Sequence, residues 1–135
     1  EQGFGHIINT GSLGGLVPAA YQAVYAASKR AVITMTECLQ YELENEGLNF
    51  SVFCPGNVRT SIFGGLTPPS DSISVEEAVD YIFKGLENKE LIIVFPQFGR
   101  DIDALYRENR QEFDKLARQV AAERRENYRT KGSYC

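Results

Sequence analysis

Three short apolar runs, separated by two segments of helical periodicity, constrain the fold of this chain more than any other feature. Each run is too short for a helix and is bounded by Gly or Pro, so each is predicted to be a strand. Strands that alternate with helices predict an α/β protein with three parallel strands joined by right-handed crossovers. The predicted strands begin at Ile7, span residues 49–54 and span residues 91–95.

The segment between the first two strands is predicted to contain a loop and then a long helix. Residues 11–20 form the expected loop, and residues 21–46 form the expected helix, which Gly47 ends. The apolar face of this helix is predicted from residues that recur at helical spacing: Val32, Met35, Leu39 and Leu43.

Two further helices are predicted in the second half of the chain. Residues 64–72 are rich in Gly, Pro and Ser and should form a loop. Ser74 and Glu77 have the spacing of a capping box, so a helix should begin after Ser74, and Asn88 should end it. One long helix is predicted over residues 101–128, with five residues inward: Ile102, Leu105, Phe113, Leu116 and Val120.

Composition narrows the class of protein. With 135 residues, of which 43% are hydrophobic, the chain has the size of one small globular domain. Its formal net charge of -4 argues against a nucleic-acid surface. Three scattered cysteines, Cys38, Cys54 and Cys135, indicate reduced thiols and a cytoplasmic location. The single His argues against a zinc cluster, no apolar run is long enough to span a bilayer, and the first residues lack a signal-peptide pattern.

Tyr25 and Lys29 form the most suggestive pair of reactive side chains. They are four residues apart, so in a helix both project from one face, one turn apart. A free phenol titrates near pH ~10, and a neighbouring cation favours its ionised form. Such a pair can transfer protons, and a Ser hydroxyl brought alongside can hydrogen-bond a substrate oxygen. Tyr-x-x-x-Lys alone is also common on the surfaces of ordinary helices.

Three motifs in a fixed order give the pair its context. A strand that leads into Gly11-Ser12 precedes the helix of Tyr25 and Lys29, and a strand that ends in Pro55-Gly56 follows it. Over about residues 5–96 this order resembles the short-chain dehydrogenase/reductase family. The resemblance implies the C-terminal part of a doubly wound, Rossmann-like parallel sheet. It also implies an oxidoreductase that uses NAD or NADP and a small-molecule alcohol or carbonyl substrate, whose identity the motifs leave open.

The resemblance also implies roles for individual residues. Tyr25 matches the family's catalytic acid/base and is also expected to contact the cofactor, and Ser12 matches the hydroxyl that orients the substrate carbonyl. Lys29 matches the residue that favours the phenolate and holds the nicotinamide ribose. The turn after the second strand matches the segment that passes the nicotinamide, with Val58 as a backbone contact and Thr60 as a hydroxyl contact, although Thr60 could instead cap a helix. The matching turn begins at Pro55 and Gly56.

The family's Gly-rich pyrophosphate loop has no full counterpart in this sequence. Residues 10–15 resemble its opening, but Val17 stands where the last glycine should be and Pro18 disfavours a helix directly afterwards. We therefore expect residues 1–135 to be a partial Rossmann-like domain, the catalytic half without the cofactor-loop half, with residues 101–135 as a helical extension. The fragment alone should be inactive. Its first strand should have an open edge, which favours a homo-oligomer.

Two other functions compete with the oxidoreductase. A folded, non-enzymatic remnant that acts as a self-associating module is the alternative from a different class. A Ser-His-Asp hydrolase would need His6 beside a strained Ser12 elbow, and the sequence around Ser12 does not have that pattern. A solvated helix face, rather than a binding patch, is predicted for five basic residues that lie among acids: Arg118, Arg124, Arg125, Arg129 and Lys131.

Overall fold

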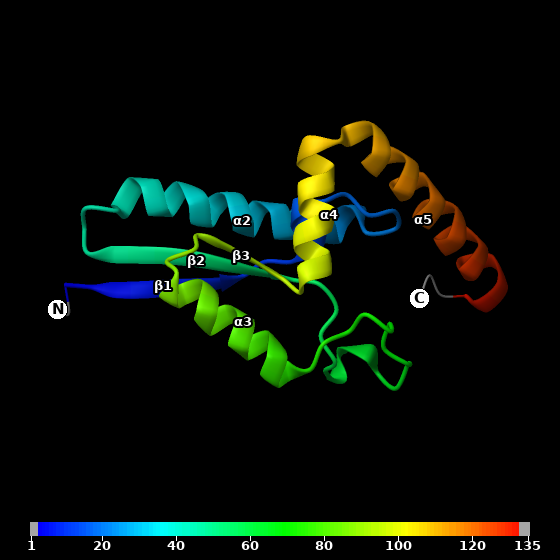
Figure 1. Ribbon diagram of the computed structural model, residues 1–135, viewed down its shortest axis with the longest axis horizontal. Helices are drawn as coiled ribbons and strands as arrows, with labels where there is room; N and C mark the ends of the chain where they lie inside the picture. Colours follow the sequence, from blue (N-terminus) through cyan, green and yellow to red (C-terminus); the bar gives the residue numbers. More distant parts are fainter. Residues whose placement is uncertain (1–2, 133–135) are drawn as a thin grey trace.

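One three-stranded parallel sheet lies at the centre of the computed structural model, which describes residues 3–132 (Figure 1). The strands are β1 (Gly5–Thr10), β2 (Leu48–Pro55) and β3 (Ile92–Phe95), in the order β1-β2-β3. In the register of the sheet, Ile7 is opposite Phe50 and Val52 is opposite Ile92. The three predicted parallel strands are confirmed.

Helices cover both faces of the sheet, as the doubly wound arrangement requires (Figure 1). Helix α2 (Ala23–Leu43) lies on one face and α3 (Val75–Glu87) lies on the other. Side chains alternate along each strand, so one strand supplies both layers of the core. Val52 and Cys54 of β2 pack with Ile33 on the α2 side, whereas Ile93 and Phe95 of β3 pack with α3.

The start of α2 and its buried face differ from the sequence prediction. The helix begins at Ala23 rather than at residue 21, because Tyr21 has a φ of 66° and is left-handed. Ile33 and Thr36 are the buried residues, while Met35 is 49% exposed. Ile33 faces the sheet because Gly11 and Gly15 let the helix approach closely there. Thr36 tolerates burial because its hydroxyl donates to the Val32 carbonyl and accepts from the Asn9 side chain.

The predicted loop over residues 11–20 contains a short helix, α1 (Leu13–Leu16), which the sequence prediction missed. Ser12 is its N-cap, and its Oγ accepts a hydrogen bond from the Gly14 amide at 3.1 Å. Val17 is extended, and Pro18 follows it. A helix of four residues has too little periodicity for a pattern to reveal it.

The capping box of α3 is present as predicted. Ser74 Oγ accepts from the Glu77 amide at 3.1 Å, and the Glu77 carboxylate accepts from the Ser74 amide at 2.7 Å. The helix ends at Glu87 with Asn88 as its C-cap, as predicted. A short 3₁₀ turn, η1 (Ser61–Phe63), lies in the loop that leads to α3.

The single helix predicted over residues 101–128 is wrong. Two helices, α4 (Gln97–Glu108) and α5 (Arg110–Lys131), meet at Asn109. Asn109 leaves the helical conformation and its side chain caps α5 by accepting from the Glu112 amide at 3.2 Å. The bend brings Phe113 into the core, where it packs edge-on against Tyr106. The start was also missed: Pro96 is the N-cap of α4.

Strand β1 pairs only with β2 within the described residues, so its other edge is open. Ile7 and Ile8 are 46% and 41% exposed, which is unusual for the apolar centre of a strand. An exposed strand edge is a site for pairing with another chain segment. The open first strand predicted from the sequence is thus present in the structure.

Candidate functional site

Ser12 lies at the end of β1, where the chain turns into α1. Gly11 immediately before it packs so tightly on β2 that an added Cβ would lie 2.8 Å from Cys54 Sγ and 2.9 Å from Val52 Cγ2. The Gly11 amide donates to the Phe53 carbonyl at 2.8 Å. These contacts fix the backbone on which Ser12 stands, and the Ser12 residue itself is only 8% exposed.

Tyr25 and Lys29 lie in the first two turns of α2. The Lys29 ammonium is 6.0 Å from the centroid of the Tyr25 ring. Lys29 Nζ donates to the Thr10 carbonyl at 3.1 Å, which ties the helix to the end of β1. Tyr25 is 45% exposed, so its ring is accessible from solvent. The two side chains therefore share one helix face, as their spacing predicts.

Gly14 brings Ser12 and Tyr25 together. A Cβ placed on Gly14 would lie 3.3 Å from Tyr25 Cε1 and 3.6 Å from Ser12 Oγ. The Tyr25 ring and the Ser12 hydroxyl therefore both lie within 3.6 Å of the same point beside Gly14. The structure thus gathers Ser12, Tyr25 and Lys29, which the sequence pointed to separately, near the carboxyl end of β1.

The turn after β2 lies near the same site, because the carboxyl ends of parallel strands lie on the same side of a sheet. Pro55 is opposite Phe95, and the Gly56 amide donates to the Phe95 carbonyl at 2.8 Å. Val58 forms an isolated bridge with Ile73. Residues 55–56 are thereby attached to the end of β3, whereas Val58 pairs with the segment that precedes α3.

The bridge at Val58 leaves the peptide groups of that residue outside the pairing. Its two hydrogen bonds use the Asn57 carbonyl and the Arg59 amide, which pair with Ile73. The Thr60 hydroxyl accepts from the Ile62 amide at 3.3 Å and so caps η1. The capping role that was open for Thr60 is therefore confirmed.

Sequence reasoning missed a polar clamp at the base of the loop that follows Val58. Asn57 Nδ2 donates to the Asp71 carboxylate at 3.1 Å and 3.3 Å. Arg59 donates to the Ser72 carbonyl and forms a 3.8 Å ion pair with Glu77. These bonds join residues on the two sides of the loop over residues 60–71. Asn-x-Arg has no local signature, so only the fold reveals the clamp.

Cys54 lies beneath the Ser12 turn, at the end of β2. Burial raises the pKa of its thiol to about 12, and a hydrogen bond from the Ser12 backbone opposes that rise. The thiol is therefore neutral at physiological pH. Within residues 3–132 no group of His, Cys, Asp and Glu side chains could hold a metal ion.

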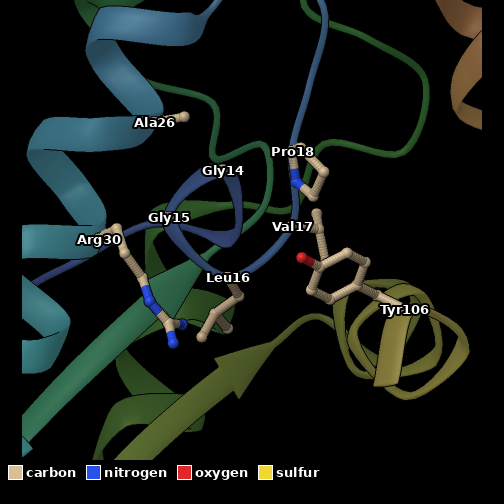
Figure 2. A pocket seen from close by; sticks show the side chains of 8 residues that line it. All are labelled: Gly14, Gly15, Leu16, Val17, Pro18, Ala26, Arg30 and Tyr106. Carbon is tan, nitrogen blue, oxygen red and sulfur yellow. The ribbon is translucent and has the colours of Figure 1, made fainter. Parts of the chain in front are cut away.

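A groove of about 280 Å³ borders the Ser12 turn. Figure 2 shows Arg30 of α2 and Tyr106 of α4 on opposite sides of the segment that carries Leu16 and Val17. Gly14 lines this groove and also contacts Tyr25. The groove thus shares Gly14 with the cluster of Ser12 and Tyr25, although neither of those two side chains lines it. Across residues 3–132, no helix combines the length and apolarity needed to cross a bilayer.

Comparison with known proteins gives consistent matches to dehydrogenases and reductases. The sequence model of a family described as short chain dehydrogenase matches residues 1–70. Over 86 residues the chain is 36% identical to 1-deoxy-11-beta-hydroxypentalenate dehydrogenase of Streptomyces exfoliatus, covering 60% of this chain and 31% of that protein. Over 105 residues it is 34% identical to ketoacyl reductase HetN of Nostoc sp., covering 72% of this chain and 36% of that one.

A solved structure shares the fold over most of the chain. The short chain dehydrogenase from Burkholderia cenocepacia J2315, determined in complex with NADP, superposes with a TM-score of 0.75 and 28% sequence identity. The match covers 84% of this chain and 47% of that one. The chain spans about a third of the length of the two curated relatives, which are 31% and 36% covered.

Proposed function

This chain belongs to the short-chain dehydrogenase family, and we propose that it is the catalytic half of an NAD(P)-dependent oxidoreductase. The observation that carries the proposal is the meeting of Ser12 and Tyr25 at Gly14, with Lys29 one turn along the same helix. The proposed reaction is hydride transfer between the nicotinamide cofactor and an alcohol or carbonyl. The cofactor supplies the hydride, and the protein supplies position and proton transfer.

Ser12 is suited to orient a substrate oxygen. Its Oγ already accepts the Gly14 amide, so the hydroxyl hydrogen is available as a donor. Burial of the turn and the tight packing of Gly11 keep the hydroxyl in place. We propose that this hydroxyl hydrogen-bonds the carbonyl oxygen of the substrate.

Tyr25 is proposed to give the proton to that oxygen during reduction and to take it during oxidation. General acid/base help of this kind is typically worth roughly 10²–10⁴-fold in rate. Its exposed phenol lies on the side of α2 that Lys29 shares, next to the Ser12 turn. No metal is needed for this step.

The donor groups at this edge fit a nicotinamide nucleoside. Lys29 spends one of its three N–H donors on Thr10 and keeps two for ribose hydroxyls. The peptide groups of Val58 stand outside its bridge and suit a carboxamide, while Pro55 and Gly56 hold that turn against β3. The hydroxyl hydrogen of Thr60 is available beside them. The NADP bound in the Burkholderia cenocepacia relative is consistent with this proposal.

The complete enzyme is proposed to contain a further part with a Gly-rich loop for the cofactor pyrophosphate, which this sequence does not carry.

We propose a homo-oligomer in a reducing, cytoplasmic setting. Cys38 and Cys54 are free thiols, in line with that setting, and Cys135 lies outside the described residues.

Replacement of Tyr25 by Phe in the complete enzyme tests the proposal. The ring and its packing remain, but the transferable proton is lost. Oxidation of NADH or NADPH, followed by absorbance with a panel of ketones and aldehydes, should slow by roughly 10²–10⁴-fold. Cofactor affinity should stay near that of the parent. Retention of most of the turnover would show that Tyr25 is not the acid/base.

A non-enzymatic, self-associating module is the second candidate. Exposed apolar residues favour it: Ile7 and Ile8 on β1, and Val24, Met35 and Tyr41 on α2. Exposed apolar surface is a feature of association sites. A complete protein that self-associates but never oxidises NAD(P)H with any carbonyl in the panel would favour this candidate.

A further inference from the structure

The C-terminal helix α5 reaches back to the turn that leads into α2. Arg124 Nη1 donates to the Ala20 carbonyl at 2.8 Å, across 104 positions of sequence. The ring of Tyr128 stacks on that of Tyr21, with centroids 6.3 Å apart and planes inclined by 19°. Two successive residues before α2 are therefore held by two side chains of α5.

The turn that receives these contacts is strained. Tyr21 has a φ of 66°, and a bulky side chain in the left-handed region is uncommon and costs energy. Gln22, the N-cap of α2, makes no side-chain capping bond. Within the turn, the Gln22 amide donates to the Ala19 carbonyl at 3.3 Å. The two contacts from α5 add support from a distant part of the chain.

The start of α5 and the start of α2, which the Arg124 and Tyr128 contacts link, are each anchored. Phe113 in the first turn of α5 is buried in the core with Leu16 and Ile33. At the other end, the first helical hydrogen bond of α2 runs from the Ala26 amide to the Gln22 carbonyl at 2.7 Å. Tyr25 precedes Ala26 in the first turn of α2, so a change in where the helix begins would also move Tyr25.

We propose that Arg124 and Tyr128 are positioning residues for Tyr25, acting through the strained turn at Tyr21. The proposal rests on the proposed function, in which Tyr25 is the acid/base. Small misplacements of reacting groups can cost about 10²-fold in rate, so control over the start of this helix has a large effect on turnover. Arg124 and Tyr128 contact Ala20 and Tyr21, so their effect on Tyr25 is exerted through the turn.

Amide hydrogen exchange on this chain tests the structural half of the proposal and requires no measurement of enzymatic activity. The amides of Gln22 and Ala26 report on the turn, and that of Ile33 reports on the rest of α2. Arg124→Ala should speed exchange at Gln22 and Ala26 by about tenfold or more, as loss of a charge-assisted hydrogen bond implies. Ile33 should be unchanged. Arg125→Ala, on the exposed side of the same helix, is the matched control.

A second pair of variants covers the case in which Arg124→Ala loosens all of α5. Tyr128→Ala removes the stack on Tyr21, whereas Tyr128→Phe keeps it. Faster exchange confined to Gln22 and Ala26 in Tyr128→Ala, and absent in Tyr128→Phe, supports the proposal. Equal exchange in Tyr128→Ala and Tyr128→Phe, or in Arg124→Ala and Arg125→Ala, overturns it. Acceleration that extends to Ile33 in both Arg124→Ala and Tyr128→Ala also overturns it.

Kinetics of the complete enzyme test the catalytic half. Arg124→Ala should lower kcat by about tenfold or more while the KM for NAD(P)H stays unchanged, and Arg124→Lys should recover part of the loss. A kcat equal to that of Arg125→Ala overturns positioning even where exchange is faster. Full turnover in Tyr25→Phe would instead show that the proposed function has failed, and the exchange result would stand independently.

Discussion

Gly15 lies directly against the backbone of Lys29: a Cβ added to Gly15 would come within 2.8 Å of the Lys29 carbonyl carbon. The Arg30 amide nitrogen would be only 2.9 Å away. Both neighbours are backbone atoms, which cannot turn aside as a side chain can. The segment that carries Ser12 therefore packs on the helix of Tyr25 and Lys29 through main-chain contact, and only glycine allows this separation.

Gly15→Ala should destabilise the protein by about 1–3 kcal/mol, because the extra methyl group overpacks this contact. Urea denaturation gives the change in the free energy of unfolding. Gly99→Ala in α4 is the matched control, since its Cβ would meet only ordinary contacts at 3.6 Å. Equal stability of the two variants would mean that the Gly15 contact relaxes freely.

Lys29→Met should weaken cofactor binding as well as turnover in the complete enzyme, because the ammonium is proposed to hold the ribose. Loss of hydrogen bonds from a charged donor is typically worth roughly 10- to 100-fold in affinity. Calorimetric titration with NADH and NADPH measures the change. Ser12→Ala should lower the rate with little change in cofactor affinity, and an equal loss of affinity in both variants would contradict the division of roles.

The 135-residue chain alone should bind neither NADH nor NADPH tightly. Its sequence has no complete Gly-rich loop, and such a loop with its helix N-terminus anchors the pyrophosphate in this family. Calorimetric titration of the chain, with its mass verified, checks the expectation. Low-micromolar binding would show that residues 55–60 and Lys29 suffice for affinity.

Self-association is expected through the open edge of β1 or the exposed face of α2. Sedimentation over a wide range of concentrations should reveal dimers or larger species. Ile8→Lys should weaken association through β1, because an edge lysine opposes strand pairing. Val24→Lys should weaken it through α2, where Val24 is 86% exposed. A monomer at every concentration would contradict the prediction.

Cys54 should resist thiol reagents while the protein is folded. Burial raises the pKa of its thiol from 9.0 to about 12, so the folded protein holds this proton where the unfolded chain releases it. The contribution of the neutral thiol to stability is complete below pH 9 and is lost as the pH rises towards 12.

Labelling of a Cys135→Ser variant measures this difference. The exposed Cys38 should react quickly, and Cys54 only at the rate of unfolding. In Cys54→Ala the fall in stability between about pH 9 and 12 should be smaller than in the parent. Rapid labelling of both thiols at neutral pH would mean that the end of β2 opens readily.

The sequence by itself determined the features whose signals are local. Short β-rich runs located the three strands, the Ser74–Glu77 spacing gave the start of α3, and the spacing of Tyr25 and Lys29 placed both on one helix face. Each signal acts over a few residues, through hydrogen bonds or periodicity that the chain imposes on itself. The order of the motifs then indicated the family.

Only the tertiary structure decided the features that depend on distant partners. Ile33 rather than Met35 is buried because two glycines of another segment admit α2 there. The helix predicted over residues 101–128 breaks at Asn109 because its second part folds back to bury Phe113. Tyr21 is held left-handed beside residues of α5 more than a hundred positions away. Such contacts exist only after the chain has closed on itself, so no local pattern records them.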